Sequence, residues 1–118
     1  MRALYSLISC NSCKRVQLEL NLPQSVTIIN IKEEPITALV LEKMKTLSGS
    51  YEALFSKRAQ LYKKLNLKER QLSEEDYKTL LLQHYTFLKR PVLIYDKNIF
   101  IGNSKAVLAA AKNFINET

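Results

Sequence analysis

The chain has 118 residues, and 47% of them are hydrophobic, which suits one domain with a single core and excludes a disordered chain. The apolar run at residues 3–8 is shorter than a signal-peptide core and far too short to span a membrane. We therefore expect a cytoplasmic protein without membrane contact. The net charge of +7 indicates anionic partners, but the basic residues lack the aromatic interleaving of a nucleic-acid-binding surface.

The first third of the chain predicts a β-α-β unit. Residues 2–9 are largely apolar and predict one strand, and residues 25–31 are rich in β-branched side chains and predict another. Between the two strands, Cys13, Val16 and Leu20 recur on one face of a predicted helix. Because strand, helix and strand follow one another within about thirty residues, we expect the strands to be parallel.

The middle of the chain, residues 36–86, predicts a block of helices. A first helix opens at Pro35 or Thr37 and ends at Gly49. A capping-box sequence at Ser73 predicts a later helix, and shorter helical pieces are expected between the two. This block interrupts the alternation of strands and helices.

The last third predicts a β-β-α unit. Residues 88–95 and 99–102 predict two strands joined by a tight turn, and hence an antiparallel hairpin. Ser104 is expected to cap a final helix over residues 105–115. We therefore expect one α/β domain over residues 1–118, with the helical block as an insertion.

The two cysteines, Cys10 and Cys13, have Cys-x-x-Cys spacing at the junction of the first strand and the first helix. The free N–H groups and the positive dipole end of a helix start stabilise an anion, which lowers the pKa of a thiol there. Lys14 and Arg15 add positive charge nearby. Our first interpretation is a redox pair, in which Cys10 is the exposed nucleophile and Cys13 the resolving thiol.

Two other interpretations of the cysteines stay open. Both could be unreactive, with one of them buried as a small hydrophobic residue. A zinc site would need four ligands and His84 is the only histidine, so we predict no metal site. We also expect no bound cofactor. Because the chain has no third cysteine, an external thiol would come from glutathione, glutaredoxin or thioredoxin.

The motifs, taken in order, resemble the ArsC/Spx family, which joins glutaredoxin-linked arsenate reductases to the Spx redox regulators of transcription. The matching stretches are Tyr5…Cys10-Asn-Ser-Cys13, Glu34-Pro35, Ser56-Lys-Arg58 and Leu88-Lys-Arg-Pro-Val92. The resemblance implies a thioredoxin-like fold, in which the β-α-β and β-β-α units form a four-stranded mixed sheet. It also implies a monomer that uses glutathione or another thiol reductant as co-substrate.

The resemblance further implies the residues of a site. Cys10 matches the nucleophile of the reductases, and Arg90 matches the arginine before the active-site proline. Arg90 would stabilise the thiolate and hold an oxyanion such as arsenate. Pro91 would be a cis-proline facing Cys10, and Ser12 could contact the anion or simply cap the helix. The predicted substrate-binding residues are Asn11, Ser12, Arg58 and Pro91.

The arginine set of the reductases is incomplete in this chain. Ser56 stands where the first arginine of the family falls, with Arg58 two residues on, and the third arginine is missing near Gly102. Conversely, Cys13 matches the second cysteine of the Spx-type pair. We favour an arsenate reductase-like thiol oxidoreductase. The alternative is an Spx-like regulator that binds the RNA polymerase alpha subunit through a Cys10–Cys13 disulfide switch.

Overall fold

The computed structural model describes residues 1–117, and the chain divides into two compact units. Unit 1 comprises Met1–Glu34 and Arg90–Thr118, and unit 2 comprises Pro35–Lys89. Unit 1 holds the sheet and both cysteines, whereas unit 2 is helical. Unit 2 therefore corresponds to the helical insertion predicted at residues 36–86.

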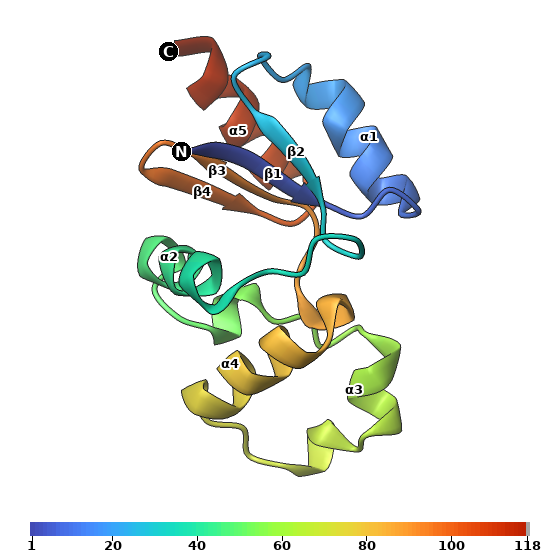
Figure 1. Cartoon of the computed structure of the whole chain (residues 1–118). Helices are drawn as coiled ribbons and strands as arrows, with labels where there is room; N and C mark the ends of the chain where they lie inside the picture. The colour runs from blue at the N-terminus through green and yellow to red at the C-terminus, as the bar shows by residue number, and fades with distance from the viewer. Residues whose placement is uncertain (118) are drawn as a thin grey trace. The chain divides into compact units, whose positions relative to one another are not determined.

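Unit 1 contains β1 (Arg2–Ser6), α1 (Asn11–Leu20), β2 (Thr27–Asn30), β3 (Val92–Tyr95), β4 (Asn98–Ile101) and α5 (Lys105–Glu117). Its strands form one sheet in the order β2-β1-β3-β4. β1 pairs parallel with β2 and antiparallel with β3, and β3 and β4 form an antiparallel hairpin (Figure 1). The predicted four-stranded mixed sheet, built from a β-α-β and a β-β-α unit, is confirmed.

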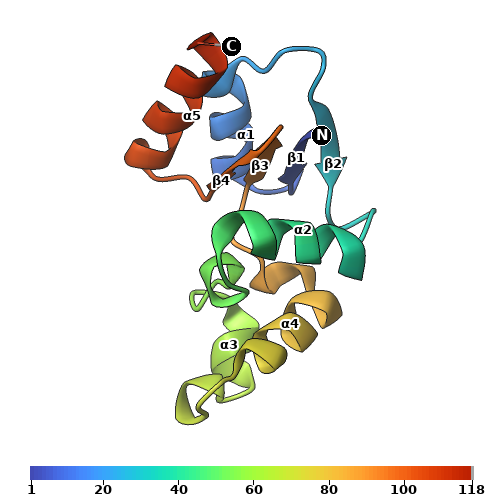
Figure 2. The ribbon, with the colours of Figure 1, turned by 90° about the vertical axis from the view of Figure 1, so that its left-hand side faces the viewer.

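The core of unit 1 lies between the sheet and the two helices α1 and α5, which pack together on one face of it (Figures 1 and 2). Val16 of α1 packs in this core with Leu4 of β1, Leu93 of β3 and Leu108 of α5. Cys13 lies on the same buried side of α1 as Val16. The packing of α1 therefore also fixes Cys13 against the sheet.

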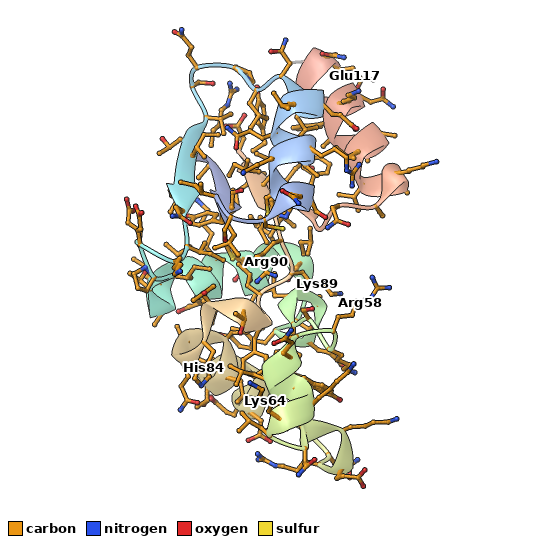
Figure 3. All side chains as sticks on the ribbon, turned by 90° about the vertical axis from the view of Figure 1, so that its right-hand side faces the viewer. Arg58, Lys64, His84, Lys89, Arg90 and Glu117 are labelled. Atoms are coloured by element: carbon orange, nitrogen blue, oxygen red, sulfur yellow. The ribbon has the colours of Figure 1, made fainter. Side chains whose placement is uncertain are left out.

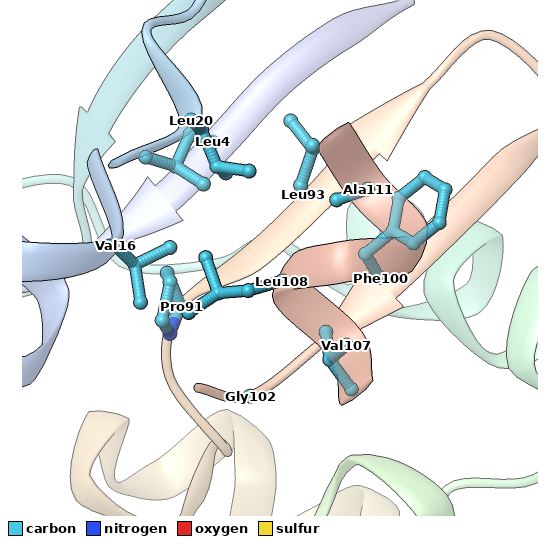
Figure 4. Close-up of a pocket in the computed structure, with 10 residues that line it drawn as sticks. All are labelled: Leu4, Val16, Leu20, Pro91, Leu93, Phe100, Gly102, Val107, Leu108 and Ala111. Carbon is cyan, nitrogen blue, oxygen red and sulfur yellow. The ribbon is translucent and has the colours of Figure 1, made fainter. Parts of the chain in front are cut away.

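A cavity of about 10 Å³ remains in this core beside Pro91 (Figure 4). Leu4, Val16 and Leu93 are among the residues around it, and most of its lining is apolar. This volume is at the lower limit for one water molecule, and an apolar site offers such a water no hydrogen bonds.

Two strands of unit 1 are shorter than the sequence predicts. β1 ends at Ser6 instead of residue 9, because the Leu7 carbonyl accepts the Cys10 N–H at 2.9 Å and turns the chain. β2 begins after a second turn, in which the Val26 N–H donates to the Pro23 carbonyl at 3.1 Å. In both places the backbone N–H and carbonyl groups form hydrogen bonds within a turn, so they are not available to pair a longer strand.

The strand predicted at residues 88–95 also starts late, at Val92. Leu88 instead forms an isolated antiparallel bridge with Phe55, and the Lys89 N–H donates to the Leu54 carbonyl at 2.8 Å, both within unit 2. The first residues of the predicted strand therefore belong to the helical unit.

Unit 2 contains α2 (Ala38–Ser48), η1 (Glu52–Leu54), α3 (Gln60–Lys64), η2 (Leu67–Glu69), α4 (Glu74–Gln83) and η3 (Tyr85–Phe87). The predicted start and end of α2 and the predicted start of α4 are confirmed. Thr37 caps α2 by accepting the Val40 N–H at 3.2 Å, and Gly49 closes α2 with a positive φ of 99°. Ser73 begins α4 with a complete capping box.

The core of unit 2 is aromatic. The rings of Phe55 and Phe87 stack with centroids 4.9 Å apart, and Tyr77 and Tyr62 contact Phe55 from other directions. Such ring pairs stabilise a core beyond the area that they bury. The short helical pieces are therefore held by packing, since none of them is long enough to be stable alone.

Candidate functional site

Cys10 lies at the start of α1, where it is the N-cap residue with an extended backbone (φ −91°, ψ 118°). The turn after β1 places it there, and its side chain is half-buried. Ser12 lies inside the helix, one residue past its first position, so the prediction that Ser12 caps the helix is wrong. Asn11 is exposed at the first helical position and Ser12 is half-buried. These two predicted anion contacts thus directly follow Cys10 in the chain.

The surroundings of Cys10 favour its thiolate. Burial acts to raise the pKa of this thiol, but other contacts outweigh it and the net pKa is lowered. The thiolate accepts hydrogen bonds from the backbone N–H and the thiol of Cys13 and from the backbone N–H of Ser12, and the positive charge of Arg90 adds to them. The lowered pKa therefore has the cause expected at a helix start, with a cation in support.

Cys13 has the opposite character. Its side chain is only 1% exposed, and burial raises the pKa of its thiol. Hydrogen bonds from the Leu7 backbone N–H and the Ser6 hydroxyl reduce the rise, whereas the nearby Cys10 adds to it, and the net pKa stays raised. At neutral pH the proton therefore resides on Cys13 and the anion forms first on Cys10. Both cysteines are free thiols in this structure.

Arg90 precedes β3 and is joined to Pro91 by a cis peptide bond, as the resemblance implies. Its carbonyl accepts a hydrogen bond from the Asn103 side chain at 3.4 Å, and the Pro91 carbonyl accepts the Gly102 N–H at 2.9 Å. The Nη1 atom of Arg90 is buried and has no hydrogen-bond partner within residues 1–117. A buried guanidinium N–H without an acceptor is available to an anion.

Arg58 belongs to unit 2, whereas the other predicted site residues belong to unit 1. Its side chain is exposed and extends away from the ribbon (Figure 3). Ser56, which stands at the position of a family arginine, donates its backbone N–H to the Phe87 carbonyl at 2.7 Å. The role of Arg58 at the site stays a prediction.

Two contacts of the site region were not foreseen from the sequence. Ser6 is 3% exposed, and its hydroxyl hydrogen-bonds to Cys13. The signal for it is a polar residue inside the apolar run at residues 3–8, which the sequence pattern assigns only to a strand. The second is Arg15, whose guanidinium donates to the Asn103 carbonyl at 3.4 Å, near the loop where the third family arginine is missing.

No group of three or more His, Cys, Asp or Glu side chains in the described part of the chain could hold a metal ion. In the same residues, no helix is long and apolar enough to cross a membrane.

The fold and the cysteine pair define an α/β protein of the thioredoxin-like class, with a dithiol at the start of its first helix. The profile of the ArsC family matches residues 5–111. The chain therefore belongs to the ArsC family.

The relatives of the chain include regulators and reductases. It is 30% identical over 105 residues to the global transcriptional regulator Spx 2 of Bacillus anthracis, a match that covers 86% of this chain and 79% of that protein. A possible arsenate reductase from Streptococcus mutans has 28% identity and a TM-score of 0.72, covering 89% of this chain and 92% of its own. The arsenate reductase of Vibrio cholerae, at 17% identity and a TM-score of 0.74, shares the fold over 98% of this chain and 95% of its own.

Proposed function

We propose that the protein is a thiol-disulfide oxidoreductase similar to the glutaredoxin-linked arsenate reductases, with Cys10 as the nucleophile and Cys13 as the resolving thiol. The observation that carries the proposal is the asymmetry of the pair. Cys10 is half-buried with a lowered pKa, and Cys13 is buried with a raised pKa. A nucleophile must be ionised and reachable at neutral pH, whereas a resolving thiol acts only after the first bond has formed.

The reaction would take place in two displacements. The Cys10 thiolate attacks a disulfide R–S–S–R, forms the mixed disulfide Cys10–S–S–R and releases one thiolate. Cys13 then loses its proton and attacks the Cys10 sulfur, which forms the Cys10–Cys13 disulfide and releases the second thiolate. An external thiol, such as glutathione or the dithiol of glutaredoxin or thioredoxin, would return the pair to its reduced form.

An oxyanion such as arsenate would follow a related course. The Cys10 thiolate displaces a hydroxyl group of arsenate, which leaves as water, and a second thiol then attacks the Cys10 sulfur. The arsenic keeps the electron pair of the broken bond and leaves as arsenite, while the two sulfurs form a disulfide. The unpaired Nη1 of Arg90 supports this substrate class, and Asn11, Ser12 and Arg58 would supply further contacts.

Arsenate-dependent NADPH consumption, coupled through glutathione, glutaredoxin and thioredoxin, tests this proposal. We expect turnover with the wild-type protein and none with Cys10→Ser. With Cys13→Ser, turnover should persist only if the external thiol can resolve the intermediate. Absence of turnover with every reductant would remove arsenate as the substrate. If wild type also failed to exchange with small disulfides, the oxidoreductase proposal itself would be removed.

A second candidate function is that of an Spx-like regulator, in which the same cysteine pair is a redox switch. The observation that favours it is the 30% identity to a protein described as a global transcriptional regulator. A pull-down of the purified RNA polymerase alpha subunit by the reduced and the oxidised protein tests it. Binding that depends on the redox state supports this function, and no binding in either state rules it out.

A further inference from the structure

Ser6 is buried at the end of β1, in a strand whose other buried residues are Ala3, Leu4 and Tyr5. Burying a hydroxyl costs free energy unless it finds a hydrogen-bond partner. The Ser6 hydroxyl finds one in Cys13, whose side chain is 1% exposed. A polar residue at this point of an apolar strand is therefore explained by the thiol beside it.

The backbone around Ser6 holds its hydroxyl in place. Ser6 is paired with Asn30 in the parallel register of β1 and β2, and the Ser6 carbonyl accepts the Ile31 N–H at 2.9 Å. The next residue, Leu7, donates its own N–H toward Cys13. The resolving thiol thus faces two donors from consecutive residues of a strand end that the sheet fixes.

We propose that Ser6 is a positioning residue for the second displacement, in which its hydroxyl stabilises the Cys13 thiolate while that sulfur attacks the Cys10 mixed disulfide. This inference rests on the proposed thiol-disulfide exchange. Cys13 reacts from a buried place that disfavours an anion, so a fixed donor there increases the thiolate population when the anion is needed. When an external thiol later reduces the Cys10–Cys13 disulfide by attacking Cys10, the same donor stabilises Cys13 as the leaving thiolate.

The effect of the hydroxyl can be expressed as a rate. The loss of one hydrogen bond to a charged sulfur should lower the thiolate population of Cys13 at neutral pH by about tenfold, which is the lower end of the range for hydrogen bonds to charged groups. A thiolate of higher pKa is more nucleophilic, with a Brønsted coefficient of about 0.4–0.5, and this offsets about half of the loss on a logarithmic scale. We therefore expect Ser6→Ala to slow the second displacement about threefold at neutral pH.

Ellman's reagent separates the two displacements in one experiment. The Cys10 thiolate releases a first thionitrobenzoate, and Cys13 releases a second when it attacks the mixed disulfide. Both phases are followed by absorbance in a stopped-flow instrument across a range of pH. The variants are Ser6→Ala, Ser6→Thr, which keeps the hydroxyl, and Ser9→Ala, which removes an exposed serine hydroxyl from the turn that follows β1.

If Ser6 has the proposed role, the first phase is unchanged in Ser6→Ala, and the second phase is about threefold slower at neutral pH. At high pH the second phase becomes as fast as in the wild type or faster, because the thiolate is then fully formed and more nucleophilic. Ser6→Thr should restore the wild-type profile, and Ser9→Ala should keep it.

Other outcomes would overturn the inference. An unchanged pH profile of the second phase in Ser6→Ala would remove it, and so would a second phase slowed equally at every pH, which indicates a structural role. A wild-type protein that releases no second equivalent would remove the resolving role of Cys13 and hence the proposed function. If only the role of Ser6 is wrong, the wild-type protein still releases both equivalents of thionitrobenzoate, so the proposed function stands.

Discussion

Replacement of Arg90 by methionine should raise the pKa of Cys10. The positive charge of Arg90 is one of the influences that lower this pKa, and methionine has a similar unbranched stem without the charge. The change is best made in a Cys13→Ser background, because Cys10 is then the only thiol and a hydroxyl donor still occupies the position of Cys13. The pKa of Cys10 should rise because the removal of a nearby cation disfavours its thiolate.

The size of the effect depends on burial. Exposed ion pairs contribute about 0.2–1 kcal/mol, and breaking fully buried ones costs about 3–5 kcal/mol. Cys10 is half-buried, and Arg90 buries Nη1 without giving it a partner in the described residues, so the pair lies between these limits. An intermediate value of about 1–2 kcal/mol corresponds to a thiolate population about 5–30 times smaller at a pH below both pKa values.

The assay is a pH titration of the thiolate absorbance in the ultraviolet, with the rate of alkylation by iodoacetamide as a second readout. Arg90→Lys keeps the charge but loses the planar fork, so it should titrate between the parent and Arg90→Met. Arg70→Met is the matched control, because Arg70 is an exposed residue of unit 2. Identical titration curves for Arg90→Met and its parent would refute the assignment of Arg90 to the thiolate.

Two further predictions concern stability. Leu4→Ala should lower the free energy of unfolding by about 3–4 kcal/mol in urea denaturation, because Leu4 is fully buried beside a cavity that the change would enlarge; a loss below about 1 kcal/mol would contradict the packed core. The two cysteine variants should differ in pH dependence. In Cys13→Ser the remaining Cys10 has a lowered pKa, so the free energy of unfolding rises with pH from that pKa up to the ordinary thiol value and is lost again on acidification. In Cys10→Ser the remaining Cys13 has a raised pKa, so stability falls as the pH rises above the ordinary thiol value. Parallel stability curves for the two variants would contradict the opposite pKa shifts.

The elements of this fold could be predicted largely from local patterns. The helical face of Cys13, Val16 and Leu20 is the buried side of α1, and the caps at Thr37 and Ser73 form where their sequences predict them. These features depend on residues within one or two turns of each other, so the local sequence determines them. The strand ends were less predictable. Residues that the apolar pattern assigned to strands form hydrogen bonds within turns or within unit 2 instead.

The site could be predicted in part. The spacing of Cys10 and Cys13 after an apolar strand placed a thiol at a helix start, and the structure places Cys10 at the N-cap. The resemblance to a family supplied Arg90 and Pro91, because no local pattern connects residue 90 with residue 10. The involvement of Ser6 was missed, since its burial beside Cys13 exists only after α1 has packed on the sheet.

The sequence by itself therefore determined the order of the helices and strands, the position of the cysteine pair and its expected chemistry as a dithiol, because these follow from residue types at fixed spacing. Only the tertiary structure showed what lowers the pKa of Cys10 and raises that of Cys13. The burial of Cys13 and the approach of Arg90 involve segments far apart in the chain, whereas the N–H groups of Ser12 and Cys13 that face Cys10 are local to the helix start. Burial raises the pKa of Cys13, whereas hydrogen bonds and then the charge of Arg90 lower the pKa of Cys10 against its own burial, and this balance is not defined until the chain has folded.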